Sequence, residues 1–267
     1  MLQYERTNAV VSLTLIGLAL YFVLEFPARV ASISLFGSPL GVNTPRRWLM
    51  IMLLVSMTMA GADMVMRSHP ILPNGRMRYL ATFWMLPGLV VVTATQILGF
   101  VPDPLIWGVS LLTTGLFLWL TIVAEFQQVP GNDSAARWAA LWRPAVGYAL
   151  ALVLFALIYH SRSRSILSAS QVLLVSGMVA LSLLRLPPAH ISRTWLYALL
   201  IGLCVGQMTW ALNYWRISTL RGSFLLFLAF YVLVGLAQQH LTAKLARRTL
   251  WEYGAIAVVA LLVIYNL

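Results

Sequence analysis

Apolar and polar positions alternate along this chain in long blocks. Nine apolar runs, each flanked by arginine or proline, occupy almost all of the 267 residues. A helix that crosses the hydrocarbon core of a bilayer needs about 20 largely apolar residues. The pattern therefore predicts an all-α, polytopic transmembrane helical bundle. The predicted spans are residues 10–26, 48–66, 80–101, 105–124, 145–159, 166–184, 195–215, 224–237 and 251–267.

Two of these runs, 145–159 and 224–237, are short for a span, so a bundle of eight spans is an alternative to one of nine. Hydrophobic residues make up 61% of the chain and charged residues only 9%, and the mean hydropathy is +0.86. A soluble domain of this length has too little interior for that much apolar surface, so lipid must cover much of it. No repeat period or linker divides the sequence, and we expect one integral membrane domain over residues 1–267.

Residues between the runs predict how several helices begin. Asp103 and Pro104 are typical of an N-cap and a first helical residue, and Thr44 and Pro45 form a similar pair before the second run. The segment 134–143 has tryptophan and leucine on one face and arginine off it. It predicts one interfacial amphipathic helix that leads into the fifth span.

Positive charge is the second feature that bears on location. The 18 cations outnumber the 7 acidic residues and give a net charge of +11. They are scattered through short loops, which disfavours nucleic acid as a partner and favours the lipid bilayer. In a nine-span chain, eleven cations fall on the side of the N-terminus and seven on the other side. The positive-inside rule then places the N-terminus in the cytoplasm.

Ionisable residues inside spans are the first candidates for function, because each is costly unless a partner satisfies it. Asp63 lies near the end of the second run, with Arg67 one helical turn later. The two form either an interfacial ion pair or a proton- or cation-binding site, and we favour the ion pair. Glu125 ends the fourth run, so we expect its carboxylate to reach water. Glu252, three residues after Thr249, matches a capping box at the start of the last helix.

Histidines are the other candidates for chemistry. His69, His190 and His240 fall on the side of the N-terminus in a nine-span chain, and converging imidazoles could hold a metal or transfer protons. Each comes from a different loop or helix end, and no paired-histidine motif is present, so we expect no metal site. No histidine lies in the middle of a run, which disfavours haem, and the single Cys204 excludes an intrachain disulfide. We therefore expect no cofactor.

Small and polar residues in the runs indicate where helices pack. Gly202 and Gly206 form a small-xxx-small motif, followed by Gln207, and the sequence leaves open whether the partner helix belongs to this chain. Six of the eleven methionines lie in the second run, on two different faces, which favours adaptable packing over a copper site. Pro87 and Gly88 predict a kink in the third span, or a break beside a substrate.

Four short strings stand out in the first third to half of the chain. They are Leu35-Phe-Gly-Ser-Pro-Leu-Gly41, Ala60-Gly-Ala-Asp63, Ser68-His-Pro70 and Phe83-Trp-Met-Leu-Pro87. These strings resemble an uncharacterised family of bacterial multi-pass membrane proteins, classed as a domain of unknown function. The resemblance implies a location in the bacterial inner membrane. It brings no activity, cofactor or catalytic residue.

Three classes of function fit these features. We favour an accessory, assembly or scaffold subunit of a membrane complex, because the loops are short, buried charge is scarce and a close-packing motif is present. The second class is a small-solute or ion transporter that uses Asp63. The third is a membrane enzyme that acts on a lipid or isoprenoid through the histidines and carboxylates. Motifs for a nucleophile elbow, a phosphate loop or a dinucleotide site are missing, which disfavours an enzyme.

Overall fold

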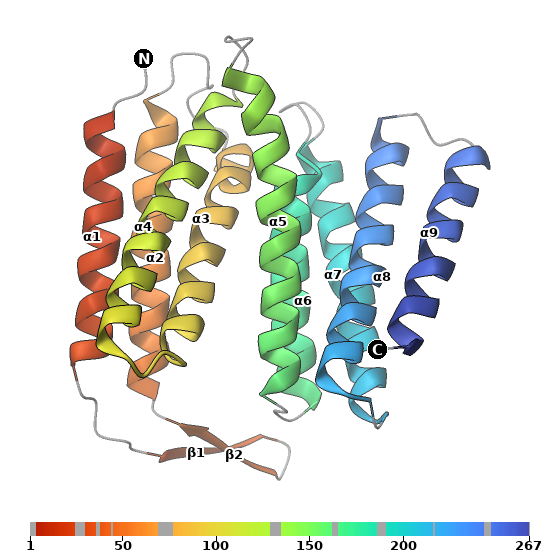
Figure 1. Cartoon of the computed structure of the whole chain (residues 1–267), viewed down its shortest axis with the longest axis horizontal. Helices are drawn as coiled ribbons and strands as arrows, with labels where there is room; N and C mark the ends of the chain where they lie inside the picture. Colours follow the sequence, from red (N-terminus) through yellow and green to blue (C-terminus); the bar gives the residue numbers. More distant parts are fainter. Residues whose placement is uncertain are drawn as a thin grey trace. The chain divides into compact units, whose positions relative to one another are not determined.

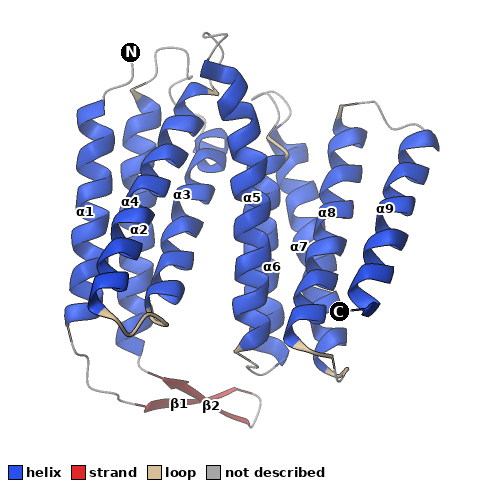
Figure 2. Cartoon of the chain, in the orientation of Figure 1, coloured by secondary structure: helices blue, strands red, loops and turns tan. Residues whose placement is uncertain are grey.

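The computed structural model describes residues 4–24, 30–35, 38–43, 45–68, 77–128, 135–161, 165–185, 191–215, 217–242 and 247–266. Within these residues the chain forms nine helices and one two-stranded antiparallel sheet (Figure 1, Figure 2). The helices are α1 (Tyr4–Val23), α2 (Pro45–Arg67), α3 (Met77–Leu98), α4 (Pro104–Gln127), α5 (Ala135–His160), α6 (Ser165–Leu183), α7 (Ile191–Asn213), α8 (Thr219–Leu241) and α9 (Arg247–Asn266). Strands β1 (Val30–Leu35) and β2 (Ser38–Asn43) pair between α1 and α2.

The predicted transmembrane helical bundle is confirmed. Eight of the described helices, α1 to α8, are long and apolar enough to cross a bilayer. The fifth and eighth apolar runs are short for a span, but helices α5 and α8 extend beyond both ends of these runs and are long enough to cross a bilayer. The helix that falls short is α9, which is apolar over Trp251–Asn266. Eight candidate spans and a ninth helix with a shorter apolar part therefore make up the described bundle.

One helix start follows the predicted capping chemistry. The Asp103 carboxylate accepts hydrogen bonds from the backbone N–H groups of Leu105 and Ile106, at 2.8 and 3.0 Å, and Pro104 is the first residue of α4. These bonds satisfy two of the N–H groups that a helix start leaves without partners. Helix α2 begins at Pro45 as expected, and Thr44 lies outside the described residues.

Two other local predictions differ from the structure. The segment predicted as an interfacial helix leading into the fifth span is helical and does lead into that span, but it is the beginning of α5 itself, which continues through Pro144 without interruption. A proline can remain inside a membrane helix when neighbouring groups satisfy the backbone that it leaves unbonded. The capping box is also absent, because α9 begins at Arg247, before Thr249. Glu252 instead pairs with Arg248 at 2.9 Å on the exposed surface of that helix.

The described helices cluster into two compact units. The first unit comprises residues 1–72 and 87–131, and the second comprises residues 73–86 and 132–267, so the division falls inside α3 at Pro87. Helix α3 is unbroken at this proline, which excludes the predicted break. The expectation of a single domain stays a prediction.

In the first unit, α1 packs against both α2 and α4. The hydroxyl groups of Thr14 and Thr58 lie 3.1 Å apart between α1 and α2, and both residues are completely buried. On the α4 side, the Trp119 indole donates a hydrogen bond of 2.9 Å to the Asn8 side chain. Such side-chain hydrogen bonds between helices are favourable in lipid, where water offers no alternative partner.

In the second unit, α6 and α7 form the most extensive helix pair. A Cβ atom added to Gly202 would lie 2.9 Å from the Leu173 carbonyl oxygen, and one added to Gly206 would lie 3.2 Å from that of Ala169. Only glycine lets two backbones approach this closely. The partner of this small-xxx-small motif is therefore α6 of the same chain.

Close approach at Gly202 gives a test of this packing. We expect Gly202→Ala to destabilise the protein by about 1–3 kcal/mol, because the added methyl group meets backbone that cannot rotate away. The melting temperature of the purified protein in detergent measures the effect. Gly254→Ala is the matched control, since a Cβ atom there has open space around it. An equal melting temperature for both variants would contradict the assignment.

Candidate functional site

Glu125 is the most deeply buried acidic side chain among the described residues. It lies in α4, two residues before the end of the helix, and is only 1% exposed. The expectation that its carboxylate reaches water was wrong. Helix α4 continues past the apolar run to Gln127, and Glu125 shares a face with the fully buried Leu118 and Ile122. A carboxylate at such a position is a functional candidate by default.

Asp63 lies on α2, one turn before the end of that helix. Its Oδ2 atom accepts a hydrogen bond of 2.6 Å from the Nε of Arg67, and its side chain is 20% exposed. Its Oδ1 atom is buried and has no hydrogen-bond partner among the described residues. The predicted ion pair is present, and it leaves one carboxylate oxygen available to another ligand.

Two uncharged oxygen atoms in the same unit are also buried without a hydrogen-bond partner in the described part of the chain. They are the Thr7 Oγ1 on α1 and the Gln127 Oε1 on α4. Thr7 is completely buried. A buried polar atom without a partner requires an explanation, such as a bound water or ion, because desolvation costs about 1–3 kcal/mol.

Helix directions bring these groups to one end of the first unit. Gly61 of α2 lies against Val10 of α1, and Gly115 of α4 lies against Leu15. Together with the Thr14–Thr58 and Asn8–Trp119 contacts, these pairs show that α1 runs antiparallel to α2 and to α4. The start of α1 therefore lies beside the ends of α2 and α4 (Figure 1).

We refer to Thr7, Asp63, Glu125 and Gln127 as the carboxylate end of the first unit. Its buried atoms are oxygens from carboxylate, hydroxyl and amide groups. Oxygen ligands suit protons and hard cations, whereas copper and zinc prefer sulfur or imidazole nitrogen. No group of three or more histidine, cysteine, aspartate or glutamate side chains that could hold a metal occurs among the described residues.

The histidine cluster proposed from the sequence is only partly visible. His69 and His190 lie outside the described residues. His240, near the end of α8 in the second unit, is exposed, and its ring lies 5.8 Å from that of Tyr197. Of the groups proposed for an enzyme site, His240 belongs to the second unit and Asp63 to the first. The enzyme site therefore stays a prediction.

Arg185 is a further polar residue that the sequence did not distinguish from the other cations. It follows α6 in the second unit, and its Nε and Nη2 donate hydrogen bonds of 2.9 and 2.8 Å to the hydroxyl and carbonyl oxygens of Thr82. Its guanidinium lies 3.7 Å from the centre of the Phe83 ring. The planar guanidinium can form both contacts at once, which fixes the end of α6 against the first turns of α3.

The eight long apolar helices define a multi-pass integral membrane protein. Residues 26–267 match the family described as "Protein of unknown function (DUF5656)", and the chain belongs to this family. The predicted relation to an uncharacterised family is thereby confirmed. No curated protein and no solved structure matches the chain.

Burial of Glu125 can be tested by thiol accessibility. In a Cys204→Ser background, we expect Glu125→Cys to react with a water-soluble maleimide on the order of tenfold more slowly than Glu5→Cys, because a buried thiol is inert. Glu5 is the matched control, since it is exposed at the start of α1 in the same unit. Equal labelling rates for the two thiols would contradict the burial of position 125.

Proposed function

We propose that the protein is a membrane transporter whose carboxylate end binds a proton or a small hard cation. The burial of Glu125 is the observation that supports this function most strongly. A carboxylate in this position is stable only if it is protonated or neutralised by a cation or a hydrogen-bonded partner. Exchange between these states is the elementary step of proton- or cation-coupled transport.

Other buried oxygens at the same end of the first unit support the same function. Asp63 Oδ1, Thr7 Oγ1 and Gln127 Oε1 are buried oxygens on the three helices that meet at this end. A bound cation or an ordered water would satisfy them, at no cost to the backbone hydrogen bonds of the helices. Arg67 holds Asp63 on the more exposed side of the site, where its own side chain is 39% exposed. The sequence suggested Asp63 as the transport residue. In the proposed site Asp63 is the more exposed carboxylate and Glu125 is the more buried one.

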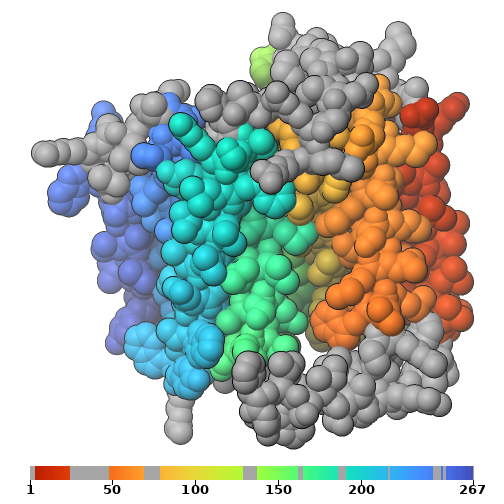
Figure 3. Space-filling view, turned by 180° about the vertical axis from the view of Figure 1, so that it is seen from behind, coloured from red at the N-terminus to blue at the C-terminus, as the bar shows by residue number. Residues whose placement is uncertain are grey.

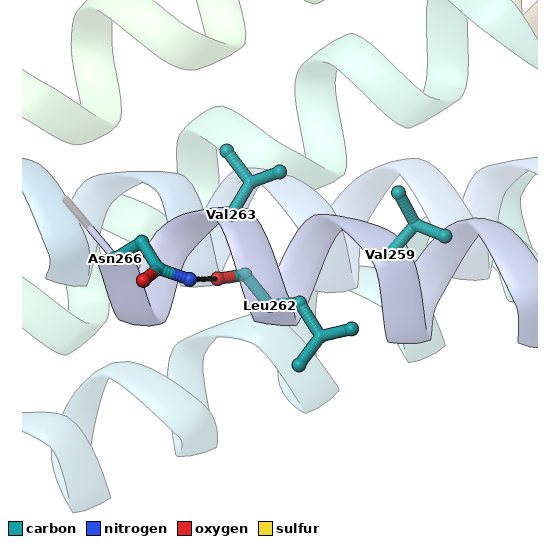
Figure 4. A pocket seen from close by; sticks show the side chains of 4 residues that line it. All are labelled: Val259, Leu262, Val263 and Asn266. Carbon is teal, nitrogen blue, oxygen red and sulfur yellow. Dashed lines mark hydrogen bonds between the residues drawn. The ribbon is translucent and has the colours of Figure 1, made fainter.

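A second candidate function is an accessory or assembly subunit of a membrane complex. It is favoured by α9, which among the described helices packs mainly on α8. A pocket of about 410 Å³ lies along α9 and is lined by Val259, Leu262, Val263 and Asn266 (Figure 4). The Asn266 side-chain amide donates a hydrogen bond to the Leu262 carbonyl of the same helix. The other three lining residues are apolar, so the lining is largely apolar. An apolar helix of another subunit or an acyl chain would fit such a surface.

We also propose that the protein lies in the bacterial inner membrane with its N-terminus in the cytoplasm. The greater number of cations on the N-terminal side supports this orientation. Fusion of a fluorescent reporter that matures only in the cytoplasm to the N-terminus should give a signal. A C-terminal fusion should be dark if α9 crosses the membrane and fluorescent if it does not. A dark N-terminal fusion with normal membrane abundance would contradict the orientation.

Ion flux tests the transport proposal. We expect proteoliposomes that contain the purified protein to take up protons or radioactive sodium faster than empty liposomes under an imposed membrane potential. Glu125→Gln should lower this flux about tenfold or more, because contacts to a charged group contribute about 1.5–3 kcal/mol. Asp63→Asn should lower it less, since Asp63 is more exposed.

Glu252→Gln is the matched control, because Glu252 is exposed on α9 and pairs with Arg248 only at the surface. Its flux should equal that of the unmodified protein. Melting temperatures separate a loss of binding from a loss of folding. The proposal would be overturned if the unmodified protein carried neither ion, or if a folded Glu125→Gln variant carried both at the normal rate.

A further inference from the structure

Gln207 is a polar residue on the outer surface of a membrane span. It is exposed on α7, six residues before the end of the helix, which places it roughly 9 Å from that end. Thr209 and Asn213, further along α7, hydrogen-bond within the protein, whereas no hydrogen bond joins the Gln207 amide to a described residue. An amide in lipid without a partner is costly, so a partner from outside the described chain is favoured.

The residues around Gln207 form a continuous stripe along α7. Exposed side chains recur at spacings of four and three residues, at Leu196, Leu200, Leu203, Gln207, Trp210 and Tyr214. This is the spacing of the a and d positions of a heptad repeat, and it keeps all six side chains on one narrow face. We call this face the α7 seam. Figure 3 shows α7, in turquoise, on the surface of the molecule.

The α7 seam differs from the face that binds α6. Gly202 and Gly206, which lie against α6, are about 100° around the helix from the seam at about 100° per residue. The small-residue motif therefore packs against α6 of the same chain, whereas the side chains of the seam remain exposed. A heptad seam with one polar residue is typical of helices that pair, because the polar residue fixes the register of the pair.

We infer that the protein forms a homodimer in which the α7 seams of two copies pack together about a two-fold axis. All copies of a chain have the same orientation in a membrane, so the two α7 helices run parallel and Gln207 meets Gln207 at the same depth. An amide carries both a donor and an acceptor, so two identical side chains satisfy each other. This self-complementarity favours a second copy over an unrelated helix.

Disulfide trapping tests this interface, since the chain has a single cysteine and it is exposed beside the seam. In a Cys204→Ser background, Leu203→Cys places a thiol in the seam. Met208→Cys is the matched control, because Met208 is exposed to nearly the same extent, 38% against 39% for Leu203, but lies off the seam. After oxidation of native membranes, we expect Leu203→Cys to give a product of twice 29.7 kDa and Met208→Cys to give little.

The amide is tested in the same background. Adding Gln207→Leu to Leu203→Cys should lower the yield of the dimer at least about threefold, and Gln207→Asn should restore part of it. Two outcomes would overturn the inference: equal yields from positions 203 and 208, or a trapped product whose mass shows a different protein. Ion flux through the carboxylate end does not enter this test, so the two proposals fail independently.

Discussion

Lipid offers no hydrogen bonds, and this constraint governs every part of the protein. Each backbone group in the hydrocarbon region must bond within its own helix, so the described membrane segments are helices of 19 residues or more. Polar side chains obey the same constraint. Many hydroxyl groups in the spans donate a hydrogen bond to a carbonyl one turn earlier, as those of Thr14 and Thr58 do. The hydroxyls of Thr14 and Thr58 also meet each other between α1 and α2. Other polar groups in the spans do not form such hydrogen bonds, and the two proposed functions rest on some of these groups.

The polar groups on which the two proposals rest lie in two places with different chemistry. The carboxylate end has buried acidic and neutral oxygens on helices of the first unit, where we propose that a proton or a cation replaces water. The α7 seam has one amide on an apolar surface, where another helix replaces lipid. The first arrangement favours transport and the second favours association, and a transporter can be a dimer. Neither proposal requires the other.

The architecture was predictable because a membrane span has a strong signal in the sequence. Runs of apolar residues gave the positions of the helices, and Asp103 with Pro104 gave the start of α4. The ends of the helices were harder to predict from the sequence. The predicted runs stop at polar residues or at proline, whereas α4 continues through the buried Glu125 and α5 continues through Pro144. This difference changed Glu125 from a residue at the water boundary into the centre of the candidate site.

The site itself was only partly predictable. Asp63 was identified from its position in a span, but the burial of Thr7 and Gln127 depends on three helices that are distant in sequence. Gln207 was noted beside Gly202 and Gly206, yet only the structure separates the face of the glycines from the exposed seam. Periodicity within one helix shows which residues share a face. It does not show which face another helix will cover.

In the proposed transporter Glu125 exchanges a proton or a cation, and infrared difference spectroscopy can detect this exchange. Purified protein in lipid is switched between acidic and alkaline buffer, and separately between sodium and choline. We expect at least one switch to change a carboxyl or carboxylate band, and this change to be absent in Glu125→Gln. Identical difference spectra for the unmodified protein and this variant, under both switches, would contradict it.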